Sequence, residues 1–251
     1  MDNVKYTAKV YDKFGKEYHK HRKDQPNFYN SCIDMPAVLS FLKKVKGKKI
    51  IDIGCGSGIY TRILKKKGAK VVGIDISQTL LEIAKKEVKN VEFYKAGIYK
   101  LPFKNNTFDS AISALMLHYV KDWNKAFKEV HRVLKKGGEY IFSTGNPLFE
   151  CRKKLKIGKQ EFKILGIGKG TNPIGNYYKE GWDNVTWQKG VIMRTHHKTY
   201  ETIIKTILRN GFSIEGYSDA KPIPQGKKIS PRDYKVYTKL PIFCVFKIKK
   251  K

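Results

Sequence analysis

A glycine-rich stretch, IDIGCGSG (51–58), is the first place in the chain where residue types and spacing suggest chemistry. Such a turn, directly after an apolar run, lets the backbone approach a nucleotide-like ligand. Its glycines are Gly54, Gly56 and Gly58, and Ile59 stands where a dinucleotide site has its third glycine. A phosphate-cradling loop would need a Gly-Lys-Ser or Gly-Lys-Thr, which does not follow. The spacing therefore argues against both of these ligand classes.

An acidic residue stands at the distance from this turn that a nucleoside site needs. Asp75 ends the apolar run KVVGID (70–75) and lies 21 residues after Gly54. A carboxylate at the end of a second strand can accept hydrogen bonds from both ribose hydroxyls of a bound nucleoside. The alternative is a carboxylate that only stabilises the N-terminus of the next helix. The glycine turn upstream favours the ribose role.

Two histidine positions could take part in a reaction. His118 follows the predicted strand 108–113, and histidine is the side chain best suited to act as a base near neutral pH. A histidine that only packs against the neighbouring loop is the open alternative. His196 and His197 precede a predicted helix, but an adjacent pair is not metal-ligand spacing, so no metal site is expected. His197 stays a candidate substrate contact.

Strand and helix patterns alternate from about residue 49 to 144, which predicts a parallel sheet covered by helices. Ser77, Asp122 and Thr199 are predicted to cap three of the helices. The alternation fails between 145 and 190, which predicts an irregular lid or loop with aromatic walls. Strands are expected at 48–53, 70–75, 91–96, 108–113, 139–144, 212–217 and 240–248, and the segment between the last two reads as a linker.

The composition of the 251-residue chain suits one large folded domain, with 41% hydrophobic residues and four scattered cysteines. No apolar run is long enough to cross a membrane, and the start lacks a secretory signal, so we expect a cytoplasmic protein. The net charge of +30 would attract nucleic acid. The lysines are spread along the chain in short groups, however, which favours ordinary solvated surfaces.

Five ordered motifs resemble those of class I S-adenosylmethionine-dependent methyltransferases, closest to the type 11 or ubiquinone-biosynthesis-like branch that acts on small molecules. The motifs are IDIGCGSG, VVGIDIS, LPFKNNTFD, ISALMLHYV and EVHRVLKKGGEYIFST. The resemblance implies a Rossmann-like α/β fold with a mostly parallel seven-stranded sheet whose last strand is antiparallel. It also implies a single domain made of an N-terminal helical cap (1–45), a cofactor-binding core (46–145), an inserted lid (146–190) and a C-terminal helix with closing strands (191–251).

The same resemblance implies a cofactor, S-adenosylmethionine, and the residues that hold it. Asp75 would bind the ribose, and Asp52 would steady the glycine loop. Tyr11 and Tyr18, with Arg22, would lie over the cofactor mouth, where the two tyrosines are candidate substrate contacts. Their i, i+7 spacing also fits a plain packing stripe, which stays open as the alternative. Gly97 departs from the family pattern, since many relatives carry an acid there. The other implied cofactor contacts are Gly54, Cys55 and Gly56 at the loop, Ile76 and Ile98 at the adenine, and Ser113, Ala114 and Leu115 on the methionyl side.

The sequence favours methyl transfer to a small-molecule acceptor, with His118 as the candidate catalytic residue. The chain lacks the [Asp/Asn/Ser]-Pro-Pro-aromatic turn of amino-methylating nucleic-acid enzymes, and it lacks a Pro-Cys after the fourth strand for attack on cytosine. The paired glutamates of arginine methyltransferases are also missing from that place. Two alternatives stay open. One is an RNA methyltransferase, which the net charge supports. The other is a cofactor-binding protein without catalysis, which the departure from the family pattern at Gly97 supports. The acceptor atom and the oligomeric state stay open as well.

Overall fold

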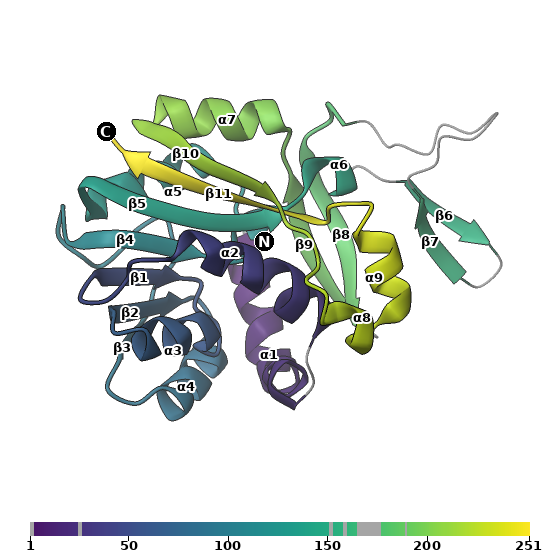
Figure 1. The fold of residues 1–251 in the computed structure, drawn as a ribbon, viewed down its shortest axis with the longest axis horizontal. Helices are drawn as coiled ribbons and strands as arrows, with labels where there is room; N and C mark the ends of the chain where they lie inside the picture. Colours follow the sequence, from purple (N-terminus) through teal and green to yellow (C-terminus); the bar gives the residue numbers. More distant parts are fainter. Residues whose placement is uncertain (1–2, 25–26, 151–152, 158–159, 165–176, 189) are drawn as a thin grey trace.

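A seven-stranded sheet forms the centre of the chain, which a computed structural model describes over residues 3–24, 27–150, 153–157, 160–164, 177–188 and 190–251. The strand order is β10-β11-β5-β4-β1-β2-β3, and only β11 runs antiparallel to its neighbours (Figure 1). The predicted fold class is therefore confirmed. The strands are β1 (Lys49–Ile53), β2 (Lys70–Asp75), β3 (Glu92–Lys95), β4 (Phe108–Ser113), β5 (Leu134–Gly145), β10 (Phe212–Asp219) and β11 (Phe243–Lys250).

Helices cover both faces of this sheet, and three of them begin at the predicted caps. Ser77 Oγ accepts from Leu80 N at 3.2 Å, and equivalent side-chain bonds to backbone N–H groups cap the helices that follow Asp122 and Thr199. These bonds satisfy amides that have no partner inside the helix. The helices of the core are α3 (Ile59–Lys66), α4 (Gln78–Glu87), α5 (Trp123–Val133) and α7 (Tyr200–Arg209).

The apolar core is divided by the sheet into two large clusters. Tyr140 and Phe142 of β5 face one cluster, which also holds Phe127 of α5, whereas Ile141 faces the other. This alternation is what a strand with both faces buried requires, because successive side chains point to opposite sides. The core therefore fixes the register of the central strands. The carboxyl ends of β1, β2 and β4 consequently meet at one edge of the sheet.

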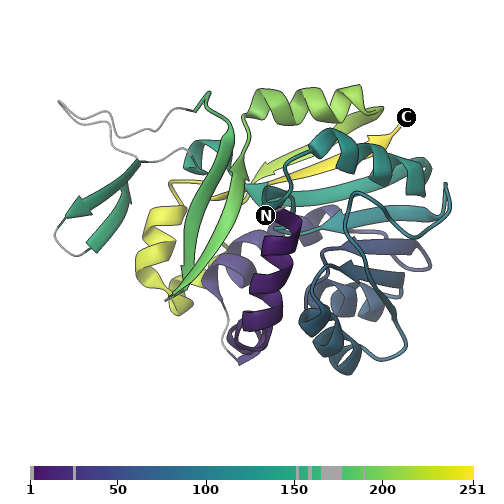
Figure 2. The same cartoon turned by 180° about the vertical axis from the view of Figure 1, so that it is seen from behind.

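The N-terminal segment forms a helical cap beside that edge (Figures 1 and 2). It comprises α1 (Asn3–Asp24), a π-helical turn η1 (Asn30–Asp34) and α2 (Met35–Phe41). Asp12 of α1 accepts from Ser77 Oγ at 2.7 Å and from Thr79 N at 3.2 Å. Gly15 allows a close approach, because a Cβ there would lie 3.2 Å from Leu80 Cδ2. The cap is thus fastened to the first turn of α4.

The segment between β5 and α7 is more regular than the sequence predicts. It contains α6 (Pro147–Glu150), a hairpin of β6 (Lys153–Ile157) and β7 (Gln160–Ile164), and a second hairpin of β8 (Gly181–Gln188) and β9 (Val191–His197). The prediction of an irregular lid was wrong for these parts, and residues 165–176 lie outside the described residues. The sequence gives little signal for β8 and β9, because GWDNVTWQ and VIMRTHH alternate only weakly between apolar and polar residues.

The linker predicted between the last two strands is also partly helical. Short helices α8 (Gly226–Ile229) and α9 (Pro231–Tyr237) lie in it. Ser230 Oγ caps α9 by accepting from Asp233 N, and a proline occupies the first turn. The dipeptide Ser230-Pro231 is a helix-start signal in the sequence, and it explains why this segment is helical where a linker was predicted.

The Asp12 contacts give a test of how the cap is held. Asp12→Ala leaves the Ser77 hydroxyl and the Thr79 amide without this acceptor, so the free energy of opening α1 should fall by about 1.5–3 kcal/mol. Hydrogen–deuterium exchange of the α1 amides should then be faster, whereas Glu215→Ala on β10 should leave it unchanged. Unaltered exchange in the Asp12 variant would show that apolar packing against α4 alone holds the cap.

Candidate active site

The glycine loop after β1 is built to hold a ligand against its backbone. Gly54 and Gly56 have left-handed φ angles of 74° and 55°, which favour glycine. A Cβ on Gly54 would lie 2.5 Å from Met116 Cγ, so a larger residue cannot fit there. A Cβ on Gly56 would meet nothing within 4 Å and would extend into the open cavity that Gly56 lines. The absence of side chains at this loop therefore keeps a cradle open.

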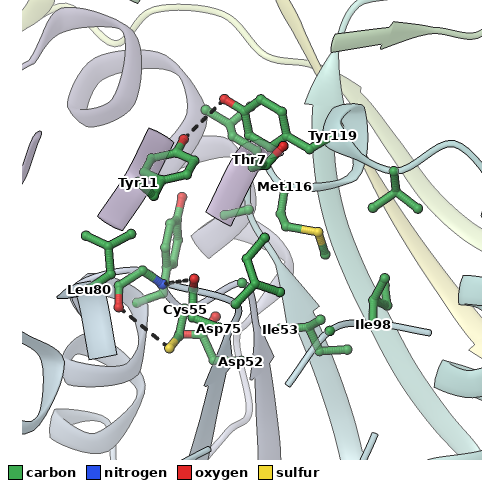
Figure 3. Close-up of a pocket in the computed structure, with 18 of the residues that line it drawn as sticks. Thr7, Tyr11, Asp52, Ile53, Cys55, Asp75, Leu80, Ile98, Met116 and Tyr119 are labelled. Atoms are coloured by element: carbon green, nitrogen blue, oxygen red, sulfur yellow. Dashed lines mark hydrogen bonds between the residues drawn. The ribbon is translucent and has the colours of Figure 1, made fainter. Parts of the chain in front are cut away.

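Asp75 lines this cavity beside the loop. Its Oδ2 accepts from Gly56 N at 2.8 Å (Figure 3). Its Oδ1 accepts from Ser77 N at 2.9 Å. Burial raises the pKa of this carboxyl, while the backbone N–H groups that it accepts from oppose the rise. A carboxylate has about four acceptor sites, so two ligand hydroxyls can still be bound. The geometry fits the predicted ribose role.

Asp52 lies deeper, beneath the loop. Its Oδ2 accepts from Thr61 Oγ1 of α3 at 2.6 Å, and the residue is only 1% exposed. Burial raises its pKa to about 7, opposed by the Thr61 hydrogen bond and supported by the charge of Asp75. Asp52 thus ties β1 to α3, which agrees with a role in steadying the loop. It also places a titrating carboxyl on the cavity wall.

Most of the predicted cofactor contacts meet in this one cavity. Ile76, Ile98 and Ala114 line it together with the loop residues, and Gly97 leaves space because its Cβ would meet only Ile76, at 3.6 Å. Ser113 differs from the prediction. It is fully buried, and its hydroxyl lies 2.5 Å from the Tyr140 hydroxyl, so it faces the core instead of the cavity. Successive side chains on a strand point to opposite faces of the sheet, so a shift of one position decides whether a residue faces the cavity or the core.

Leu115 has an unusual backbone in this region. Its φ of 50° is in the left-handed region, which residues other than glycine rarely adopt. Its amide donates to Ser143 Oγ at 3.0 Å, which holds the turn after β4 in place. Such backbone geometry costs about 1–3 kcal/mol and is concentrated at functional sites. Leu115 was predicted from the family motif, whereas its strained backbone has no signal in the sequence.

The cap closes the cavity from the other side. Thr7, Tyr11 and Tyr18 of α1 line it, as the resemblance implies for the two tyrosines (Figure 3). Arg22 Nη1 donates to the Tyr18 hydroxyl at 2.7 Å, and Asp34 of η1 accepts from Tyr60 OH at 2.6 Å. Burial raises the pKa of Asp34. The sequence interpretation missed Asp34 and Tyr60, because neither belongs to a motif.

These features allow a test of whether the predicted cofactor fits. A nucleoside needs the Asp75 carboxylate and glycines that let the loop backbone approach it, and both are present. An amino-acid moiety needs opposite charges at one end, and Arg22 and Asp34 both line the cavity. The residues present therefore fit S-adenosylmethionine, whose positive sulfonium would lie in a cavity that also carries buried carboxyls.

A second cavity of 430 Å³ lies next to the first. The two share Tyr11, Tyr18, Asn30, Leu115 and Tyr119, so these side chains stand between them. The remaining wall comes from the end of β5, from α6, from the β8–β9 hairpin and from the start of β11. Because the shared wall belongs to both cavities, a molecule in the second cavity would lie beside a ligand in the first.

His118 lines the second cavity, in the short helix η2 (Leu117–Tyr119) that follows β4. Its ring centroid lies 4.2 Å from that of Tyr119. Its Nδ1 is buried and has no hydrogen-bond partner among the residues that the structure describes. Burial lowers its pKa to about 4, so the imidazole is neutral at pH 7. A neutral ring beside an open chamber can accept a hydrogen bond or a proton.

His197 also lines the second cavity, at the end of β9. Its Nδ1 lies 3.5 Å from Glu150 Oε2, and its Nε2 lies 2.8 Å from the Tyr177 carbonyl oxygen. Burial lowers its pKa, but the Glu150 carboxylate and the Tyr177 carbonyl together outweigh burial, and the pKa is raised. His196 does not join it: burial and Lys198 lower the His196 pKa to about 4, and its ring packs against Trp182.

The aromatic wall of this chamber differs from the prediction. Tyr178 is 83% exposed and Trp182 is 40% exposed, and Tyr177 accepts from Tyr200 N instead of facing the chamber. The side chain of Trp187 lies outside the described residues. The aromatic residues that do line the second cavity come mainly from the cap and the sheet edge: Tyr11, Tyr18, Tyr29, Tyr119, Phe149 and Phe243.

Comparison with known proteins agrees with this geometry. The family described as "Methyltransferase domain" matches residues 51–142. A crystal structure of an S-adenosylmethionine dependent methyltransferase from Mesorhizobium loti has a TM-score of 0.73 and 29% identity, and the match covers 86% of this chain and 97% of that one. An uncharacterized protein of Haemophilus influenzae is 32% identical over 82% of this chain and 84% of its own length.

A ubiquinone biosynthesis O-methyltransferase of Coxiella burnetii is 28% identical, and the match covers 57% of this chain and 64% of that protein. The chain belongs to the S-adenosylmethionine-dependent methyltransferases, and S-adenosylmethionine is its cofactor. Within the described parts of the chain no cluster of three or more potential metal ligands occurs, and no helix there has the length and apolarity of a membrane span.

The Asp75 geometry predicts the cost of losing the ribose contact. Asp75→Ala should weaken binding of S-adenosylhomocysteine by about 1.5–3 kcal/mol, the range for hydrogen bonds to a charged group. Titration calorimetry measures this, with circular dichroism to show that the variant is folded. Unchanged affinity in a folded variant would mean that other groups hold the ribose.

The raised pKa of Asp52 predicts that protons leave when a cation binds. At pH 7 this carboxyl is about half protonated, and a positive ligand in the same cavity favours the charged form. Binding of S-adenosylmethionine should therefore release up to about half a proton more than binding of S-adenosylhomocysteine, whose sulfur is uncharged. Calorimetry in buffers of different ionisation enthalpy measures the difference, which Asp52→Asn should remove. An equal proton count for both ligands in the unaltered protein would contradict this assignment.

Proposed function

We propose that this methyltransferase transfers the methyl group to a small-molecule acceptor held in the second cavity. The observation that carries the proposal is the wall that the two cavities share at Tyr11, Leu115 and Tyr119. The shared lining places the two cavities side by side, so we propose that the methyl group passes to the acceptor at this boundary. The chamber of 430 Å³ lies within the size range of small-molecule sites.

Bound S-adenosylmethionine supplies an activated methyl group, so the protein mainly has to align the reactants and exclude water. The cap does both, because α1 covers the cofactor cavity and gives Tyr11 and Tyr18 to the acceptor chamber. Tyr11 and Tyr119 stay uncharged near neutral pH, because burial raises the pKa of both hydroxyls. Their hydroxyl oxygens lie 3.2 Å apart, which closes the cap against η2.

His118 is the residue that we propose to face the acceptor. It lines the chamber, it is neutral at pH 7, and its buried Nδ1 has no partner among the described residues. A neutral imidazole can accept a hydrogen bond that orients the acceptor, and it can take the acceptor's proton as the new bond forms. Its pKa of about 4 makes it a weaker base than a histidine that titrates near neutral pH.

Relatives support a small acceptor. Ubiquinone biosynthesis O-methyltransferase and, at 36% identity over 46% of this chain, the demethylmenaquinone methyltransferase of Chlorobaculum parvum are both named for work on quinone-related small molecules. The test is a transfer assay with labelled S-adenosylmethionine against a metabolite extract and against total RNA in parallel. Label should enter small molecules. Label in RNA alone would overturn the proposal.

RNA is the second candidate acceptor, because the chain carries a net charge of +30. Binding to phosphates through lysine would weaken steeply with salt. The same assay run at two salt concentrations separates nonspecific attraction from transfer, since only transfer leaves a methylated nucleoside after nuclease digestion.

The His118 proposal predicts a loss of turnover. His118→Ala should lower kcat by about 10²–10⁴ with the affinity for S-adenosylhomocysteine unchanged, because the residue lies outside the cofactor cavity. The rate of the unaltered enzyme should not fall through His118 protonation until pH approaches about 4, the pKa that burial gives it. Normal kcat in His118→Ala would leave alignment as the whole mechanism.

A further inference from the structure

The acceptor chamber differs in charge from the rest of the molecule. Lysine and arginine make up 52 of 251 residues, yet neither lines the second cavity among the residues that the structure describes. The carboxylates of Glu150 and Asp183 do line it. His197 is the one basic side chain with a raised pKa on the described wall, and it already lies 3.5 Å from the Glu150 carboxylate. A phosphate or carboxylate entering the cavity would therefore meet no lysine or arginine of the described residues, and desolvating such an anion there would be costly.

Glu150 is positioned at the chamber by its backbone surroundings. A Cβ on Gly145 would lie 2.0 Å from Glu150 Oε1, so only glycine at the end of β5 leaves room for this carboxylate. The side chain of Glu150 is 19% exposed, and His197 Nδ1 lies 3.5 Å from it. Asp183 stands on β8 and accepts from the following amide, Asn184 N, at 2.8 Å. The two carboxylates come from separate elements, α6 and β8, and both line the chamber, Glu150 as a largely buried residue and Asp183 as an exposed one.

Acidic side chains outnumber basic ones on the described wall of the chamber. Glu150 and Asp183 line it, and no lysine or arginine of the described residues does. His118 is neutral at pH 7, because burial lowers its pKa to about 4. His197 is the other histidine of the wall, and its Nδ1 lies 3.5 Å from Glu150 Oε2.

Aromatic rings complete the chamber. Tyr11 and Tyr18 meet edge to face, with centroids 5.5 Å apart, and Tyr11 and Tyr119 do so at 6.0 Å. Tyr29, Phe149 and Phe243 belong to the same lining. Aromatic faces attract ammonium groups and also pack against apolar bodies. Carboxylates combined with aromatic rings are the usual way to recognise an organic cation.

We propose that the acceptor is a small organic amine, positively charged at neutral pH, with an apolar or aromatic body. This inference rests on the proposed function, since it concerns what the second cavity holds. The carboxylates of Glu150 and Asp183 bind the ammonium, and the tyrosine rings hold the body beside the cofactor cavity.

The experiment measures binding to the protein saturated with S-adenosylhomocysteine, so that no turnover is needed. The probes are tyramine, 4-hydroxyphenethyl alcohol and 4-hydroxyphenylacetate, which share a phenol body and end in a cation, a neutral group and an anion. Calorimetry should show tyramine binding about ten- to hundredfold more tightly than the alcohol, as expected for a hydrogen-bonded charge. The carboxylate should bind most weakly.

Variants then assign the preference to the chamber. Glu150→Gln and Asp183→Asn should each reduce the ratio of tyramine to alcohol affinity, and the double variant should abolish it. Glu215→Gln removes an exposed carboxylate on β10, outside the chamber, and should leave the ratio unchanged. Retained affinity for S-adenosylhomocysteine shows that each variant is folded.

Three results would overturn the inference: equal or tighter binding of the alcohol or the carboxylate, no binding of tyramine at millimolar concentration, or an unchanged ratio in the double variant. The proposed function fails differently. A protein that prefers tyramine in this binding assay but transfers no label to any small molecule would retain a cation site and lose its assignment as a small-molecule methyltransferase.

Discussion

The hydrogen bond from the Gly56 amide to the Asp75 carboxylate is the interaction on which the cofactor cavity depends. It joins the loop after β1 to the end of β2 at 2.8 Å, and both residues line the cavity that a nucleoside would fill. Without it the buried carboxylate would lose one of its compensating donors, and the left-handed loop would lose its link to the neighbouring strand. Parallel strands alone bring these two chain segments to one edge, but the hydrogen bond sets how wide the cradle is.

The cap is fastened to the same corner. Asp12 binds the hydroxyl of Ser77, whose backbone amide donates to Asp75, so α1 and the ribose wall share one residue as their anchor. The negative charge of Asp12 also contributes to raising the pKa of Asp75. A cation in the cavity relieves this repulsion between carboxylates. The repulsion between these carboxylates therefore favours a positively charged ligand in the cavity, as S-adenosylmethionine is at its sulfonium.

The sequence predicts the sheet, the caps and the cofactor wall because each depends on local signals. Ser77 is a typical helix-capping residue, and β2 is an apolar run. The glycine spacing from Gly54 to Gly58 predicts a tight turn that lets the backbone approach a ligand. The acceptor chamber has no such signal. Glu150 reaches it only because Gly145 has no side chain, and Asp183 arrives on a hairpin whose alternation is weak. Even within a motif the sequence does not settle which side chains reach the cavity: Ser113 belongs to the motif but faces the core, whereas the next residue, Ala114, lines the cavity.

The two cavities cannot be treated as independent, because Tyr11 and Tyr119 belong to both. The bond between their hydroxyls closes α1 against η2, and η2 carries His118. Any shift of α1 that admits or releases the cofactor must therefore also move the wall of the acceptor chamber. Conversely, a bound cofactor that presses on Tyr11 fixes the rings against which the acceptor packs. This coupling is reciprocal: a ligand that moves Tyr11 or Tyr119 from either cavity changes the lining of the other, because both side chains belong to both cavities.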